Sequence, residues 1–164
     1  AHFVISAVKH DREREGRETV ALDIEEQYEK IYRYCFCRLR SREQAEDITQ
    51  ETFLRWFASD TYRDTNQVLQ YLYTIARNLC IDEYRRSDFD PQTAEPPCQE
   101  TDPLLSIALR AELDKLEAED RELILLRYVN EVPVKVLCGL YQQSRFSLHR
   151  RMKRILKVLR EALE

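Results

Sequence analysis

Residues 88–102, DFDPQTAEPPCQETD, constrain the fold more than any other part of the chain, because they divide it into two short pieces. The segment contains three of the five prolines and five acidic residues, but no lysine or arginine. This composition is typical of a solvated linker. We therefore expect one domain at residues 22–87 and another at residues 103–164, each small enough to bury only about 60% of its surface on folding.

The segments on both sides of the linker carry helix signals. Sheet-rich folds need glycine at their turns, and the whole chain has two glycines. Asp23 and Ser41 each stand three residues before a glutamate or glutamine, which is the spacing of a capping box. Asp102 before Pro103 pairs a cap with the residue favoured at the first helical position. We predict an all-α fold with helices at 24–39, 42–58, 67–86, 103–117, 119–129, 133–140 and 145–162.

Several classes of protein are disfavoured by the sequence. Residues 1–21 form an N-terminal extension to which the sequence assigns no role. No apolar run approaches the roughly 18 residues of a membrane span, and no basic stretch precedes the first apolar one, so we expect a cytoplasmic protein without membrane insertion. Because the sequence shows no Gly-rich phosphate loop, paired acids or nucleophile with its base, we expect neither an enzyme nor a cofactor.

The five cysteines are spread along the chain without the C-x-x-C spacing of a zinc or redox site. Cys35 and Cys37 are close enough in sequence to share a metal, but in a helix they point about 200° apart. We therefore expect ordinary buried or surface thiols and no metal site.

The expected helix 42–58 has an apolar stripe that includes Ala45, Ile48 and Trp56. Its opposite side combines acidic and amide groups with one leucine, namely Asp47, Gln50, Glu51 and Leu54. One interpretation is a solvated acidic face with a single exposed leucine. The other is an apolar contact whose acidic surroundings steer it toward a basic partner. The periodicity leaves both interpretations open.

The expected helix 67–86 is unusual on the side turned away from its apolar stripe. That side mixes arginines, tyrosines and an asparagine, in the set Tyr73, Thr74, Arg77, Asn78, Ile81, Tyr84, Arg85 and Arg86. Arginines neutralise phosphate, and tyrosines stack on unpaired bases with about 1–3 kcal/mol for each base. Half-buried contacts between domains are the alternative. The polar loop expected at 59–67, which includes Arg63 and Asn66, is placed to wall a pocket above this helix.

The end of the chain is basic, although the whole chain has a net charge of −4. A short helix from Pro133, a turn with Ser144 as cap, and a long basic helix form the pattern of a helix-turn-helix. Candidates for base edges and nearby phosphates lie at the start of the long helix, at Arg145, Phe146, Ser147, His149 and Arg150. Candidates for backbone phosphates follow at Lys153, Arg154 and Lys157. An amphipathic basic helix that binds an acidic protein is the alternative.

Both halves of the sequence resemble the bacterial sigma factors of the extracytoplasmic-function type. AEDITQETFLRWF, at 45–57, is similar to the region-two segment that docks on the clamp helices of RNA polymerase. YLYTIARNLCIDEYRR, at 71–86, is similar to the adjoining segment that melts and reads the minus-ten promoter element. Residues 116–163 are similar to the region-four domain that binds the minus-thirty-five element. The resemblance implies core RNA polymerase, promoter DNA and an anti-sigma protein as partners.

Carried over by position, the resemblance implies a role for three sets of residues. The polymerase contact would comprise Asp47, Gln50, Glu51, Phe53 and Leu54. The opened minus-ten strand would lie near Arg63, Asn66, Tyr73, Arg77, Asn78, Arg85 and Arg86. The duplex minus-thirty-five element would meet Arg145, Phe146, Ser147, His149, Arg150, Lys153 and Arg154.

The chain departs from the family pattern at several places, among them Tyr71 where many relatives have tryptophan and Gly139 in a helix interior. Glu117 stands where the family often has proline, so the preceding helix is free to run on. Tyr141-Gln142-Gln143-Ser144 replaces the usual Leu-Gly-Ile-Ser, and a glutamine at positive φ costs about 1 kcal/mol relative to glycine. Two other functions stay open. One is a stand-alone helix-turn-helix regulator that binds duplex DNA without polymerase. The other, which the altered turn keeps open, is a sigma-like adaptor or decoy that binds an anti-sigma protein and no DNA.

Overall fold

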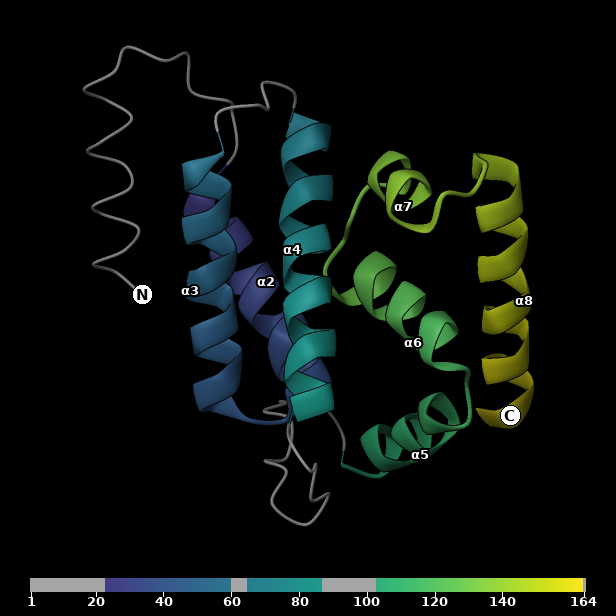
Figure 1. Cartoon of the computed structure of the whole chain (residues 1–164). Coiled ribbons are helices and arrows are strands. Elements are labelled where there is room, and N and C mark those ends of the chain that lie inside the picture. Colours follow the sequence, from purple (N-terminus) through teal and green to yellow (C-terminus); the bar gives the residue numbers. More distant parts are fainter. Residues whose placement is uncertain (1–22, 60–64, 87–102, 164) are drawn as a thin grey trace. The chain divides into compact units, whose positions relative to one another are not determined.

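The structure, a computed structural model, describes residues 23–59, 65–86 and 103–163 (Figure 1). Every element in these ranges is helical, which confirms the predicted all-α fold. The chain divides into two compact units, residues 1–97 and 98–164. The expected linker at 88–102 and the extension at 1–21 lie outside the described residues, so the domain boundaries stay predictions.

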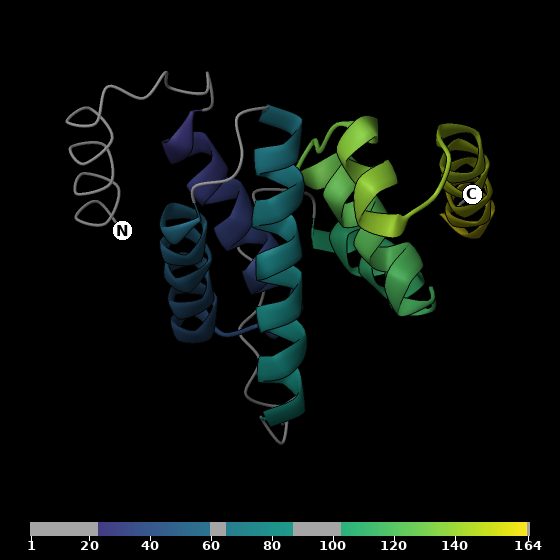
Figure 2. The ribbon, with the colours of Figure 1, turned by 45° about the horizontal axis from the view of Figure 1, so that its top comes forward.

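The first unit consists of α2 (Ile24–Leu39), α3 (Arg42–Ala58) and α4 (Thr65–Arg86), each packed against the other two (Figures 1 and 2). Two of its helices begin where their caps predicted. The Asp23 carboxylate accepts hydrogen bonds from two backbone N–H groups, at 3.0 and 3.1 Å. The Ser41 hydroxyl accepts one from the N–H of Gln44 at 3.4 Å. These bonds satisfy N–H groups that a helix start otherwise leaves unpaired.

Aromatic side chains fill the core of the first unit. Phe53 lies against Tyr28 and Trp56, with ring centroids 5.2 and 5.9 Å apart. Two threonines of α3 are also fully buried, because each returns its hydroxyl to the carbonyl four residues earlier, at 2.6 and 2.7 Å. Aromatic packing of this kind fixes the three helices relative to one another and so positions their outer faces.

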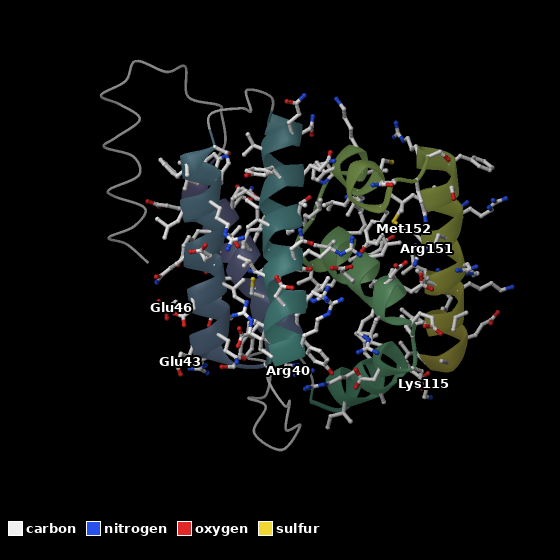
Figure 3. The ribbon with its side chains drawn as sticks, viewed as in Figure 1. Arg40, Glu43, Glu46, Lys115, Arg151 and Met152 are labelled. Carbon is white, nitrogen blue, oxygen red and sulfur yellow. The ribbon has the colours of Figure 1, made fainter. Side chains whose placement is uncertain are left out.

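The second unit contains α5 (Pro103–Asp114), α6 (Ala118–Ile124), the π-helical turn η2 (Leu125–Val129), α7 (Val134–Tyr141) and α8 (Arg145–Leu163). The long helix α8 packs against α5, α6 and α7. Its buried side chains include Leu148, Met152 and Ile155. Figure 3 shows Met152 and Arg151 on the side of α8 that faces the other helices of this unit.

The prediction that the helix from Pro103 continues to Glu117 is wrong, since α5 ends at Asp114. The Arg121 guanidinium donates to the carbonyl oxygens of Leu113, Asp114 and Leu116, at 3.0, 2.9 and 3.2 Å. These are carbonyls that a helix end leaves unsatisfied, so a side chain from α6 provides the cap. Glu117 has φ of −54°, a value that suits the proline often found there.

The turn between α7 and α8 takes the conformation expected of it without a glycine. Gln142 has φ of 51° and ψ of 40°, in the left-handed region. The N–H of Gln143 donates to the carbonyl of Cys138 at 3.1 Å, and the Ser144 hydroxyl accepts from the N–H of Ser147 at 3.2 Å. The turn is therefore formed by hydrogen bonds at both helix ends, with a glutamine bearing the backbone strain.

Candidate functional site

The outer face of α3 presents one exposed leucine among acidic groups. Leu54 is 50% exposed, and Asp47 is exposed beside it. Gln50 and Glu51 are half-buried, and Glu51 forms an ion pair with Arg55 at 2.6 Å. Glu43 and Glu46 continue the acidic face toward the start of the helix (Figure 3). The face combines an apolar contact with negative charge, which suits a basic partner.

Phe53 does not belong to this outer face. Its side chain is 1% exposed and lies between Tyr28 and Trp56 in the core. A side chain buried in this way offers almost no surface for a direct contact with a polymerase, and its expected place at that contact stays a prediction. Phe53 instead packs α3 onto the core. Because α3 packs against two helices, it buries more of its circumference than a single apolar stripe.

The outer face of α4 retains most of its predicted residues. Asn78, Tyr84, Arg85 and Arg86 are exposed, whereas Asn66 and Arg77 are half-buried. The expected loop at 59–67 is shorter than predicted because α4 already begins at Thr65. Arg63 lies outside the described residues.

Tyr73 was expected on this outer face and is in the core instead. It is 2% exposed, and its ring meets the ring of Tyr34 edge to face with centroids 5.9 Å apart. Tyr73 thus joins α4 to α2. Of the tyrosines named for this face, Tyr84 is the one that is accessible to a stacking base.

One hydrogen bond links the two outer faces of the first unit. Gln44 of α3 donates from Nε2 to Oε1 of Glu83 on α4, at 3.0 Å. Glu83 lies between the exposed residues Asp82 and Tyr84 near the end of α4. The bond therefore holds the basic end of α4 in register with the beginning of α3.

The first turns of α8 carry a basic, solvent-facing surface. Arg145, His149 and Arg150 are exposed, and Phe146 between them is 74% exposed. The guanidinium carbon of Arg150 lies over the Phe146 ring, 5.5 Å from its centroid. Ser147 is half-buried. A helix start that offers basic and aromatic groups is suited to the major groove of DNA.

Lys153 and Arg154 continue the exposed surface farther along α8. Arg154 lies 3.7 Å from the carboxylate of Asp120, a long and loose contact in which the arginine side chain is 70% exposed and the aspartate side chain 14% exposed. Lys157 pairs in the same loose way with Glu161 at 3.6 Å. Both cations can therefore reach a phosphate.

Arg151 differs from its basic neighbours because it serves the fold. Its Nε donates to Asp120 at 2.5 Å and its Nη2 to Glu119 at 3.2 Å, and it lies over the ring of Tyr141 with 5.7 Å to the centroid. Burial disfavours its charge, but the hydrogen bonds to the two carboxylates outweigh burial and raise the pKa of Arg151. The Tyr141 hydroxyl donates to Glu122 at 3.1 Å. This network, which the sequence did not reveal, fixes α8 against α6 and α7.

The described residues include no group of three histidine, cysteine or acidic side chains that could hold a metal. Cys35 is buried and Cys37 is exposed, on opposite sides of α2 as their spacing predicts. A hydrogen bond with Cys80 and, as a smaller effect, burial raise the pKa of Cys35 well above its usual value. Within the same ranges, no helix is both long and apolar enough to span a membrane.

Residues 24–89 match the family Sigma-70 region 2. The chain is 35% identical over 79 residues to the ECF RNA polymerase sigma factor SigW of Bacillus subtilis, an alignment that covers 47% of this chain and 42% of SigW. It is 25% identical to SigX of the same organism, with 90% of this chain and 84% of SigX covered. The chain thus spans less than half the length of SigW, but most of SigX.

The fold is also similar to a solved structure, the sigma factor RpoE from Bartonella quintana in complex with the anti-sigma factor NepR. The TM-score is 0.63 at 22% identity, and the match covers 83% of this chain and 91% of RpoE. The region-two match coincides with the three-helix unit that carries the acidic and arginine-rich faces. From these findings, residues 24–89 form a Sigma-70 region 2, and the chain is similar to sigma factors of the extracytoplasmic-function type.

Proposed function

We propose that this chain binds core RNA polymerase and directs it to promoters, where it helps to open the DNA. The observation that carries the proposal is the region-two match over residues 24–89, which includes all three helices of the first unit. In this proposal the polymerase performs the chemistry, and the chain contributes docking, duplex contacts and capture of one strand. The proposal includes the cytoplasmic location, because transcription takes place there.

The polymerase contact is assigned to the outer face of α3. Leu54 would enter an apolar site on the partner, since half of its surface is exposed to solvent. Asp47, Gln50 and Glu51 surround it and would meet basic groups. Phe53 acts in this proposal only by holding α3 in place.

The minus-ten strand is assigned to the exposed side of α4 and the residues before it. Arg77, Arg85 and Arg86 would neutralise phosphates, and Asn78 would hydrogen-bond a base edge. Tyr84, rather than the buried Tyr73, has the exposed ring that stacking on an unpaired base requires. Arg63 and Asn66 are assigned to the same strand on the basis of the family resemblance.

The duplex minus-thirty-five element is assigned to α8. Arg145, Phe146, Ser147, His149 and Arg150 occupy the helix start, where a recognition helix reads bases. Lys153 and Arg154 follow on the exposed side and would contact the backbone phosphates. An anti-sigma protein is proposed as a further partner on the basis of the family resemblance.

Run-off transcription tests the proposal directly. The full chain is mixed with bacterial core RNA polymerase on a library of random promoters, and the start sites are mapped. We expect specific start sites that core polymerase alone does not produce. Failure to produce any specific start site across a range of salt concentrations would refute the proposed function.

Copurification with core polymerase separates this function from a stand-alone DNA-binding regulator. Leu54→Arg and Asp47→Arg should each abolish copurification, because each places positive charge on the acidic face of α3. Glu29→Arg, an equal charge reversal at an exposed position of α2, serves as the matched control. A stand-alone regulator would not depend on core polymerase, so none of the three changes would alter its function.

A further inference from the structure

Phe146 is the most exposed large apolar side chain among the described residues. It lies in the first turn of α8, and at 74% exposure it contributes little to the core of the second unit. Leaving a phenylalanine in water forfeits the roughly 1.5–3 kcal/mol that its burial would contribute. The stability of the unit therefore does not explain why this position is aromatic.

Arg150 follows one helical turn later, and its guanidinium lies over the Phe146 ring with 5.5 Å to the centroid. In the described part of the chain Arg150 forms no ion pair, in contrast to its neighbour Arg151. A cation over an aromatic face is stabilised even at an exposed site. The contact with the ring therefore restricts the conformations of the Arg150 side chain. A ligand would meet the ring and the guanidinium together.

We propose that Phe146 and Arg150 form one reading unit, which selects a guanine with a thymine one or two base pairs away. This inference rests on the proposed binding of duplex DNA by α8. Arginine bonds to O6 and N7 of guanine through two N–H groups, and phenylalanine contacts the C5-methyl group of thymine in the same groove. The 5.5 Å between guanidinium and ring lies between one and two base-pair rises of about 3.4 Å, which sets the spacing.

The surroundings of the pair favour DNA over a protein as the ligand. Arg145, His149 and Lys153 are exposed around it, and residues 145–154 contain no acidic side chain. A polyanion is attracted to such a surface, and the ring supplies the apolar contact that a phosphate backbone does not use. Docking on a protein is the competing explanation, and the experiment below separates the two.

The test uses holoenzyme assembled from the full chain and core polymerase, together with a promoter duplex selected from a random library. Each thymine of the upstream element is replaced in turn by uracil, which removes only the methyl group. At one position within two base pairs of a guanine, uracil should lower affinity about fourfold, the value of one buried methyl group. Phe146→Ala should abolish this difference between thymine and uracil.

Arg150 is tested on the same duplexes. Arg150→Ala should reduce the preference for that guanine by about 5- to 150-fold, the range for a bidentate base contact. Phe146→Ala should weaken the same preference more modestly, because the guanidinium loses its support. Phe146→Leu should keep the thymine preference while weakening the effect on guanine, since leucine is apolar but offers no aromatic face.

Val158→Ala is the matched control, because Val158 is exposed on the same helix far from its beginning. It should leave both preferences unchanged. The inference is overturned if uracil binds as well as thymine at every position, or if Phe146→Ala retains the thymine preference. It is also overturned if Phe146→Ala weakens binding to core polymerase without DNA, which would indicate a protein contact. A holoenzyme that selects no site at all would instead refute the proposed function.

Discussion

Replacing Arg151 by methionine should loosen α8 from the second unit. The Arg151 side chain is 16% exposed, and that of its partner Asp120 is 14% exposed. Methionine retains much of the length of arginine but has neither charge nor donors. The Asp120 carboxylate would then remain largely buried with Arg154 at 3.7 Å, and the stacking on Tyr141 would be lost.

The stability that the second unit should lose in Arg151→Met follows from the burial of Arg151 and its acidic partners. Breaking a fully buried ion pair by removing one partner costs about 3–5 kcal/mol. An exposed pair contributes less than about 1 kcal/mol. Since Arg151 and Asp120 are mostly buried whereas the second acid, Glu119, is 66% exposed, we expect about 2–3 kcal/mol. That free energy corresponds to a roughly 30- to 150-fold change in the opening equilibrium of the unit.

Amide hydrogen exchange of the full chain, followed by mass spectrometry of peptides, measures this change locally. Peptides from α6 and α8 should exchange about 30- to 150-fold faster in Arg151→Met, while those from α3 provide the internal reference. Arg154→Met is the matched control, because the Arg154 side chain is 70% exposed. This change should raise the exchange rates of the same peptides by less than about fivefold. If both variants exchange at the same rate, the network does not hold α8 as described.

Four other predictions follow from the described residues. Phe53→Ala should lower the free energy of unfolding by about 3–5 kcal/mol and Leu54→Ala by less than about 0.5 kcal/mol, in urea titrations; equal losses would contradict the core position of Phe53. Gln142→Gly should raise that free energy by up to about 1 kcal/mol by relieving the left-handed backbone, and a lower urea midpoint would count against strain there. Lys153→Ala should reduce the slope of log affinity against log salt by about 1, and an unchanged slope would remove it from the phosphate contacts. Asn78→Ala should slow promoter opening, measured by permanganate reactivity, at unchanged polymerase binding; normal opening would exclude its base contact.

Local signals predicted the helices well where the cause of a helix end is local. The caps at Asp23 and Ser41 act on N–H groups two or three residues away, so α2 and α3 begin where expected. The end of α5 was not predicted, because the group that caps it is a side chain of another helix. Arg121 reaches back from the next helix to carbonyls five to eight residues earlier, and no spacing rule in the sequence indicates that contact.

The candidate site was predicted less completely. A helical wheel identifies the apolar stripe of a helix, but it does not show how many neighbouring helices cover the residues beside that stripe. Tyr73 and Phe53 flank such a stripe, and each is buried because its helix packs against two neighbours. Arg151 shows the opposite limit. Its type and position are those of a solvated basic face, and only the approach of Asp120 reveals that it stabilises the fold.

The π-helical turn η2 has a consequence for changes in chain length. Its hydrogen bond from the N–H of Asn130 to the carbonyl of Leu125, at 3.0 Å, spans five residues and therefore takes up one residue more than an α-helical turn. Deleting one residue between 125 and 129 would return this segment to an α-helical turn ahead of α7. The three-residue turn at 142–144 has no extra residue of this kind. Its hydrogen bonds complete the end of α7 and the start of α8, so a change in its length would break them. Insertions and deletions in related chains should therefore collect at η2 and avoid the turn before α8.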